Sequence, residues 1–541
     1  MAPSQALSCR HSAGGRSAGL LLALVATAAC ASNAGMIAPL DTSSIPMADP
    51  GSKLPEDWQR GAFIEIYVRG YKDSDGDGIG DLRGLTQSLD YLRDLGVTGI
   101  WLMPINSSQD HDHGYAVTDY RDIEPKYGTL ADFDELLAQA HARGIGIIID
   151  YVMNHSGSDN PAFVYSRASP DNPFRSWYVW LARKPSGWTI YGNDPWYASS
   201  GSFYFAGFTS FMPDFNLREP AVVAYHQDSM RFWLNRGVDG FRFDAVANLI
   251  ENGATAWEDQ PESRALMGDV RRMVGGYARR YIVCEAPPDP AGFASDAACG
   301  SAFAFGHQSD LLNAARGNPS ALLSVAAYGD NAQPTAATFL ANHDSFAGRR
   351  IFTQLNGDLA QYKLAAATYL LQPGIPFLYY GEEIGMADGP LSGDWGLRTP
   401  MSWTGDAGKA GFTTGTPFRA PSTNVRLYNV AAELDDPASL LNFYKAMLGL
   451  RRARPSIARG AYEAAVVDGS VMSFRRVLGG ERTLVVINYG SDAAVASVAG
   501  LPRNAGFAAL YPAGAAEVTA DASGNASVPI AARSVAVFAQ R

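Results

Sequence analysis

Residues 144–150 read GIGIIID, and the chain continues after this run with Asn154 and His155. The run is almost continuously aliphatic, which is the pattern of a β-strand that is covered on both of its faces. Such strands occur in parallel sheets with helices on either side. The polar residues that follow the run are therefore candidates for a site at the end of a buried strand.

On both sides of this strand the sequence alternates between strand and helix patterns. Further strands are predicted over residues 63–68, 97–104, 237–244, 281–285, 337–342 and 375–380. Apolar residues at helical spacing predict helices over residues 82–95, 131–143, 221–235, 262–279 and 359–371. Repeated β/α units of this kind leave two architectures, a doubly wound sheet or an eight-stranded barrel.

Two stretches break the alternation. Residues 155–217 are irregular and rich in Trp, Tyr, Phe and Pro, and they are too long for an ordinary βα loop, so we predict an inserted domain there. From residue 460 the pattern changes to short alternating segments bounded by Gly and Asp. This predicts a separate antiparallel β domain, a β-sandwich, over residues 460–541, which leaves residues 57–459 for the β/α body.

The first 29 residues resemble an export signal. They contain Arg10 and Arg16, no acidic residue, and an apolar run that ends in alanines and is too short to span a bilayer. Cys30 directly after this run resembles a bacterial lipoprotein lipidation site, and export with or without a lipid anchor remains open. Residues 30–56 are rich in Ser, Ala and Pro, which is typical of a tether. We expect a periplasmic or secreted protein.

Composition excludes several classes of protein. The 541 residues are 47% hydrophobic, which is enough apolar side chain to fold and excludes a disordered chain. The formal charge of −11 opposes nucleic-acid binding, because a phosphate polyanion needs a basic surface. We expect a monomer without a transmembrane segment. Cys284 and Cys299 are close enough in sequence for a disulfide in an oxidising compartment, but sequence alone leaves their pairing open.

Polar residues gather at the ends of four predicted strands. They are Asp150, Asn154 and His155; Arg242 and Asp244; Glu285; and Asn342, His343 and Asp344. A single strand-end Asp is usually the N-cap of the next helix. Four clusters are harder to explain in that way, because buried charges that serve only structure are costly unless they are paired. One rim of a barrel is where such residues would form an active site.

Seven ordered segments resemble the α-amylase family of glycoside hydrolases. They are GVTGIWLMPI (96–105), DYVMNH (150–155), MPDFN (212–216), GFRFD (240–244), VCEA (283–286), FLANHD (339–344) and GIPFLYYGEE (374–383). RTPMSW (398–403) and AGFTTGTPF (410–418) resemble stretches of its oligosaccharide-cleaving branches. The resemblance runs from about residue 57 to the C-terminus. It implies a (β/α)8 TIM barrel with an inserted domain B after the third strand and a C-terminal antiparallel β domain.

Carried over by position, the resemblance makes Asp244 the nucleophile, Glu285 the general acid and then base, and Asp344 a stabiliser of the reacting sugar. A retaining glycosidase needs two such carboxyl groups about 5–5.5 Å apart. Arg242, two residues before Asp244, would point to the same side of the strand and keep that carboxylate ionised. Glu285 must instead stay protonated, through apolar packing and nearby negative charge.

The remaining substrate residues also follow from the resemblance. His155 and His343 are expected to donate hydrogen bonds to the reacting sugar, and Tyr115 is expected to lie beneath it as an aromatic platform. Asp112 would bind the terminal hydroxyls together with a partner such as Arg398. The alternative is that Asp112 and Arg398 form surface ion pairs.

The segment DSDGDGIGDLRG (73–84) predicts a cation site. Asp73, Asp75 and Asp77 before a glycine resemble the start of an EF-hand loop, although Gly84 stands where that loop carries Glu. The family resemblance implies structural calcium bound by these three residues, the main-chain carbonyl of Ile79 and the carboxylate of Asp81. The alternative is a solvated Asp-Gly turn.

The predicted function is a retaining glycoside hydrolase that cleaves α-1,4-glucosidic bonds in starch, maltodextrins or maltooligosaccharides, as an α-amylase does. The alternative on the same site is an α-glucosidase, an oligo-1,6-glucosidase or a 4-α-glucanotransferase. Ala247 and Asn248 occupy positions where many endo-acting amylases carry a Lys-His pair, which weakens the endo-amylase prediction. A hypothesis of another class is a glycan-binding homologue without activity. A cofactor-dependent oxidoreductase is disfavoured, because no glycine-rich dinucleotide loop follows a strand.

Overall fold

The computed structural model describes residues 40–331 and 333–541, and its centre is a parallel sheet of seven named strands. In sheet order they are β10 (Tyr281–Cys284), β9 (Gly240–Phe243), β5 (Gly146–Tyr151), β2 (Gly99–Leu102), β1 (Phe63–Ile66), β12 (Ile375–Tyr379) and β11 (Ala337–Phe339). Every residue of these strands is buried, as the aliphatic runs predicted.

The position between β10 and β11, the two ends of this sheet, is filled by two residues that carry no strand pattern in the sequence. Ala302 forms a parallel bridge with Cys284 at the end of β10, and Phe303 forms one with Ala337 at the start of β11. The N–H of Phe303 donates to the carbonyl of Cys284 at 3.0 Å, and the N–H of Ala337 donates to that of Ala302 at 2.9 Å. This short link closes the curled sheet into a barrel. A disulfide joins Cys284 to Cys299 just ahead of it.

Helices follow the strands along the chain. They include α2 (Leu82–Gln87), α3 (Leu89–Leu95), α4 (Leu130–Ala142), α6 (Pro220–Arg236), α7 (Pro261–Val274), α9 (His307–Ala315), α10 (Pro319–Asn331), α12 (Leu359–Leu371) and α15 (Leu440–Ala453). The helix expected over residues 82–95 divides at Ser88, whose hydroxyl donates to the carbonyl of Gly84. The helix expected over residues 262–279 ends at Val274, because two glycines follow it.

The long segment after β5 contains helix α5 (Pro161–Ala168) and a three-stranded antiparallel sheet in the order β6 (Trp180–Leu181), β8 (Ser202–Phe205) and β7 (Trp196–Ser199). Its aromatic side chains form a small core of their own around Ile190, Trp196 and Phe205. The aromatic richness of this segment is thus explained by a satellite core. The limits predicted for the inserted domain, residues 155–217, stay a prediction.

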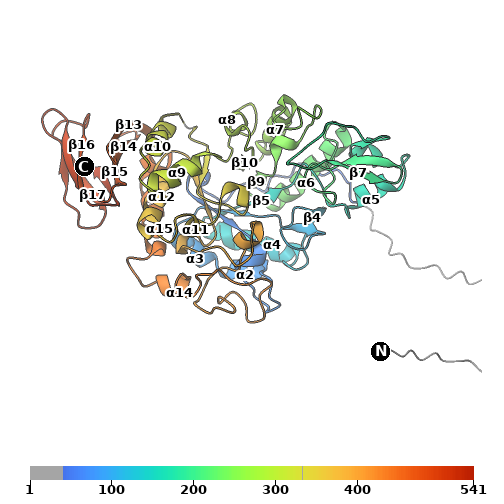
Figure 1. The fold of residues 1–541 in the computed structure, drawn as a ribbon, viewed down its shortest axis with the longest axis horizontal. Helices are drawn as coiled ribbons and strands as arrows, with labels where there is room; N and C mark the ends of the chain where they lie inside the picture. Colours follow the sequence, from blue (N-terminus) through green and yellow to red (C-terminus); the bar gives the residue numbers. More distant parts are fainter. Residues whose placement is uncertain (1–39, 332) are drawn as a thin grey trace, which may run out of the picture. The chain divides into compact units, whose positions relative to one another are not determined.

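The C-terminal region is an antiparallel sheet in the order β13 (Ala461–Asp468), β14 (Val471–Leu478), β15 (Glu481–Asn488), β20 (Ser534–Gln540), β17 (Gly506–Tyr511) and β18 (Val518–Thr519). One face packs on the smaller sheet of β16 (Ala494–Val498) and β19 (Ala526–Ile530). Side chains of the other face, such as Val485 and Val537, belong to the core of the barrel helices. Figure 1 shows these strands beside α10 and α12.

The first described residues lie against the barrel. The N–H of Ile45 donates to Asp228 in α6 at 3.0 Å, the N–H of Ala48 donates to Asn235 at 2.9 Å, and Leu54 is buried. Part of the stretch predicted as a tether is therefore fastened to the fold. The predicted export signal and Cys30 lie outside the described residues. Within residues 40–331 and 333–541, no helix combines the length and apolarity that a bilayer crossing requires.

Candidate active site

One buried guanidinium holds three carboxyl groups at the mouth of the barrel. Arg242 in β9 is fully buried, and its Nη1 lies 2.8 Å from Asp150 Oδ1 and 2.7 Å from Asp244 Oδ1. Its Nη2 lies 2.7 Å from Glu285 Oε2. Alternation along a strand places Arg242 and Asp244 on one side, and Glu285 follows the neighbouring strand β10 directly. The cation offsets part of the cost of burying three acids.

The environment raises the pKa of both predicted catalytic carboxyl groups. Burial is the main cause, and it raises the pKa of Glu285 above 4.5 and that of Asp244 above 3.8. The charge of Asp244 raises the pKa of Glu285 further, whereas Arg242 lowers both. Both carboxyl groups contact the same guanidinium and act on each other's pKa, so they lie close together, as the pair of a retaining glycosidase does. This proximity supports a retaining arrangement with Glu285 as the proton donor.

Asp344 lies on the opposite side of the site, between His343 and Arg398. Its Oδ1 accepts from Arg398 Nη2 at 2.8 Å, and its Oδ2 lies 3.1 Å from His343 Nε2. Arg398 also contacts Asp394 at 3.3 Å and donates from Nε to the carbonyl of His343. Burial raises the pKa of Asp344, and Arg398 opposes that shift.

Both ring nitrogens of His343 contact other side chains of the protein. Its Nδ1 lies 2.5 Å from the buried carboxyl group of Glu65 in β1, and the hydroxyl of Tyr115 lies 2.6 Å from its Nε2. Tyr115 stacks on His343 with ring centroids 5.5 Å apart, and its hydroxyl donates to Asp150 at 3.0 Å. The structure thus brings His343 to the site as a support for Tyr115 and Asp344. Its predicted contact with the sugar stays a prediction.

His155 has a different environment, because one ring nitrogen is available to a ligand. The side chain is buried, and its Nε2 has no hydrogen-bond partner within the described part of the chain. Asn154 Nδ2 lies 3.3 Å from its Nδ1, so a proton on Nε2 is the consistent tautomer. Burial lowers the pKa of His155 to about 3, which keeps the ring neutral. This geometry suits a donor to a sugar hydroxyl.

These groups surround a cavity of about 380 Å³. Its lining includes the predicted residues Tyr115, His155, Asp244, Glu285, Asp344 and Arg398. His113 and Asp394 line the same cavity, as do the exposed rings of Tyr191 and Phe346. The volume falls in the range of small-molecule sites.

Asp112 and Arg398 contact different partners in the structure, and their predicted binding of the terminal sugar hydroxyls stays a prediction. Asp112 Oδ1 lies 3.1 Å from Arg419 Nη2 and accepts from the hydroxyl of Tyr67 at 2.7 Å, whereas Arg398 turns to Asp344. Both arginines are buried. Arg419 was missed because it follows the recognised AGFTTGTPF segment by one position, and sequence spacing does not show which of two arginines reaches an acid.

The acidic loop brings together three of the five predicted metal ligands. Carboxylate oxygens of Asp73, Asp75 and Asp81 lie within 4.8 Å of one another, which is a donor set that suits a hard cation such as calcium. Asp77 instead contacts Lys126 at 2.9 Å, and one of its oxygens accepts from the N–H of Ile79. Calcium in this loop stays a prediction.

Two further residues belong to the site, although the sequence predicts a role for neither. Asp150 ends the aliphatic run of β5 and accepts from Trp101 Nε1 at 3.2 Å as well as from Arg242. Glu65 sits within a buried strand, where a lone acid among apolar residues is the one available clue. Both act beneath the residues that line the cavity, so their function is to orient those residues.

Comparison with known proteins agrees with this geometry. A family model described as "Alpha amylase, catalytic domain" matches residues 65–460. The chain is 35% identical to Alpha-amylase 3 of Dictyoglomus thermophilum, over 80% of this chain and 85% of that protein. It is also 35% identical to the trehalose synthase/amylase TreS of Mycobacterium tuberculosis, over 79% and 81% of the two chains. The structure of the trehalulose synthase MutB from Pseudomonas mesoacidophila superposes with a TM-score of 0.77 at 28% identity, covering 91% of this chain and all of that one.

Proposed function

Because the chain belongs to the α-amylase family, whose members are glycoside hydrolases and transglycosylases, we propose that it acts on short α-glucosides. In this proposal it moves the terminal glucosyl unit to water or to a sugar hydroxyl, with retention of configuration. This proposal corresponds to the alternative function in the sequence analysis, an α-glucosidase or glucanotransferase. We prefer it to a starch-cleaving α-amylase.

The buried ion pair of Asp344 with Arg398 carries this proposal. Arg398 and Asp394 line the cavity beside Asp344, and Arg398 is only 5% exposed. In this proposal the Asp344–Arg398 pair and the partly exposed carboxylate of Asp394 bind the hydroxyl groups of a terminal glucosyl unit. The exposed rings of Tyr191 and Phe346 lie on the lining as well, and they suit the sugar that leaves or accepts. Charged groups that bind terminal hydroxyls favour a chain end over the middle of a polymer.

The proposed reaction has two displacement steps. Asp244 attacks the anomeric carbon while Glu285 gives its proton to the departing glycosidic oxygen, which leaves a covalent glycosyl ester on Asp244. Glu285, now a carboxylate, removes a proton from water or from a sugar hydroxyl, and that oxygen displaces Asp244. Arg242 contacts both carboxyl groups and balances their charge through the cycle.

A product time course tests the proposal. Maltose, maltoheptaose, sucrose, isomaltose and soluble starch are incubated with the protein, and every released sugar is separated by chromatography. We expect glucose or a rearranged disaccharide from the short substrates at the earliest time points, with starch nearly unchanged. NMR of the first product should show the α-anomer. An early mixture of maltooligosaccharides from starch would instead establish an endo-acting amylase and overturn the proposal.

A further inference from the structure

A cavity of about 380 Å³, which we call the base cavity, lies at the opposite end of the barrel strands from the catalytic carboxyl groups. Its lining includes Arg60 before β1, Arg280 before β10 and Thr335 before β11, together with Arg271 and Arg272 in the last turn of α7. Four arginines thus line the base cavity, and none of its described lining residues is acidic. In a chain with a formal charge of −11, such a concentration of cations requires an explanation.

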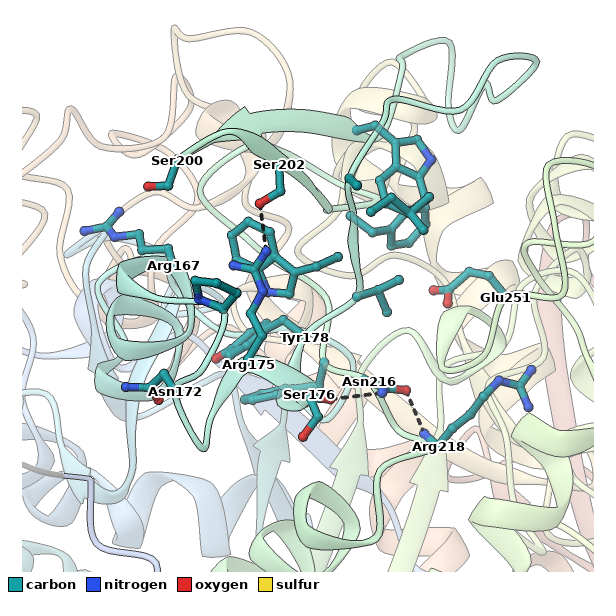
Figure 2. Close-up of a pocket in the computed structure, with 18 of the residues that line it drawn as sticks. Arg167, Asn172, Arg175, Ser176, Tyr178, Ser200, Ser202, Asn216, Arg218 and Glu251 are labelled. Carbon is teal, nitrogen blue, oxygen red and sulfur yellow. Dashed lines mark hydrogen bonds between the residues drawn. The ribbon is translucent and has the colours of Figure 1, made fainter.

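A larger groove in the inserted segment, of about 1180 Å³, has a different lining. Arg175 and Arg218 share it with Asp171 and Glu251, and Figure 2 shows Arg218 and Glu251 on the same side of the groove. A lining of both signs does not select the charge of a ligand, whereas a lining with cations alone does. The base cavity is therefore the stronger candidate for a ligand site, and we expect its ligand to be an anion.

Arg60 contributes a positive charge that no acid neutralises within the described residues. Its one side-chain hydrogen bond there runs from Nη1 to the carbonyl of Pro334 at 3.0 Å. The buried guanidinium of Arg451 lies next to it and donates to the carbonyl of Arg60 at 3.2 Å. Burial, together with the charges of Arg476 and Arg60, lowers the pKa of Arg451 to about 9. Because these cations lie close together without carboxylate partners, the potential beside the base cavity is positive.

Arg280 carries an N–H group that the protein does not use. Its side chain is 1% exposed, and its Nε has no hydrogen-bond partner in the part of the chain that the structure describes. Nη1 donates to the carbonyl of Ala278 at 2.7 Å, and Nη2 donates to that of Gly51 at 3.1 Å. The acid in contact with it is Asp49, whose Oδ1 lies 3.4 Å from Nη2. A buried guanidinium with a free donor is costly unless a ligand accepts from it.

Arg271 and Arg272 have a structural role, but it leaves them open to a ligand. Cations in the last turn of a helix offset its dipole. Each arginine also contacts one exposed aspartate outside the lining, Asp296 for Arg271 and Asp269 for Arg272. Exposed ion pairs are weak and do not prevent a second anion from binding. A Cβ atom on Gly300, where φ is +76°, would lie 2.7 Å from Arg271 Nε, so this glycine makes room for the guanidinium at the wall of the base cavity.

We propose that the base cavity binds a phosphate group, either as the free ion or as a monoester. A phosphate group carries a charge of about −2 at neutral pH and offers three acceptor oxygens, so it can bond several guanidinium groups at once, whereas a carboxylate carries a single charge. The volume falls within the range of small-molecule sites and leaves room for the organic part of a monoester. The ligand would connect the starts of β1 and β10 and stabilise the barrel from the end opposite to the catalytic cavity. This inference is independent of the proposed function.

Calorimetric titration with inorganic phosphate and, separately, with glucose 6-phosphate tests the proposal, with NaCl holding the ionic strength constant. Thr335→Glu places a carboxylate in the half-buried part of the lining, and Thr335→Gln is the matched control of equal size without the charge. Arg60→Gln removes the arginine that lacks an acidic partner among the described residues. Arg183→Gln removes an exposed arginine outside the lining and controls for net charge. Thermal melting of each variant shows that it is folded.

We expect the wild-type protein, Thr335→Gln and Arg183→Gln to bind inorganic phosphate at one site with equal affinity. Arg60→Gln should weaken binding at least about ten-fold, and Thr335→Glu should abolish it. If Arg60→Gln fails to fold, the two Thr335 variants decide the matter. Tighter binding of glucose 6-phosphate than of phosphate, lost in Thr335→Glu, would identify a monoester as the occupant, and the reverse order would identify the free ion.

Three results would overturn the proposal. The first is that the wild-type protein binds neither ligand at millimolar concentration. The second is unchanged binding in Thr335→Glu, which would place the ligand elsewhere, for example in the catalytic cavity. The third is equal weakening in Arg60→Gln and Arg183→Gln, which would show a general effect of net charge.

Discussion

Reduction of the Cys284–Cys299 disulfide should lower the melting temperature by a few degrees. The two cysteines are separated by 15 residues, and closing a loop of that length stabilises a folded protein by about 3 kcal/mol in the chain-entropy model. Unfolding entropy is roughly 2 cal/mol/K per residue, or about 1 kcal/mol/K for a cooperative unit of about 500 residues. The expected decrease in melting temperature is therefore about 3 °C.

The same bond should affect catalysis, because Glu285 directly follows Cys284 and its N–H is bonded to the neighbouring strand. We expect kcat to fall on reduction, with a smaller change in KM, since the proton donor loses a constraint while the cavity wall on the side of Asp344 is untouched. Wild-type protein is measured with and without reductant, by thermal melting and steady-state kinetics, with thiol titration to confirm reduction. A Cys284→Ala/Cys299→Ala double variant, which should not respond to reductant, is the control. Two newly titratable thiols with a melting temperature and kcat unchanged would refute the reasoning.

Three further outcomes are expected. Arg242→Lys should lower kcat/KM by about 10²–10³, because one ammonium cannot hold the three carboxyl groups that the guanidinium contacts; near-normal kinetics would contradict this. Activity should be present below the raised pKa of Glu285 and be lost as pH rises through it, so the alkaline limb of the kcat/KM profile should lie well above pH 4.5. Calcium at 100 times its Kd should stabilise the wild-type protein by about 2.7 kcal/mol but not Asp81→Asn, as measured by melting in EDTA and in calcium.

The sequence predicts the buried strands well, and it also places the predicted catalytic residues near the ends of those strands; their catalytic roles stay predictions. A strand covered on both faces is mostly apolar, so polar residues appear at or near its end, as Asp150 does in β5 and Asp244 does directly after β9. Ala302 and Phe303 were missed because two residues carry no periodicity, although they close the barrel. The contact of Asp112 with Arg419 could not be predicted, because side-chain direction in irregular loops is set by packing and not by spacing.

The strand order of the C-terminal sheet limits how early this sheet can fold during synthesis. Strand β20 pairs with β15 on one side and β17 on the other, so it lies inside the sheet although it is the last of these strands along the chain. During synthesis the partner edges of β15 and β17 stay open until Ser534–Gln540 has been made, and open edges invite pairing between chains. The face of this sheet that carries Val485 and Val537 also completes the core around the barrel helices. A stop codon before Ser534 would therefore leave the core around the barrel helices incomplete and two strand edges open, and we expect such a chain to aggregate.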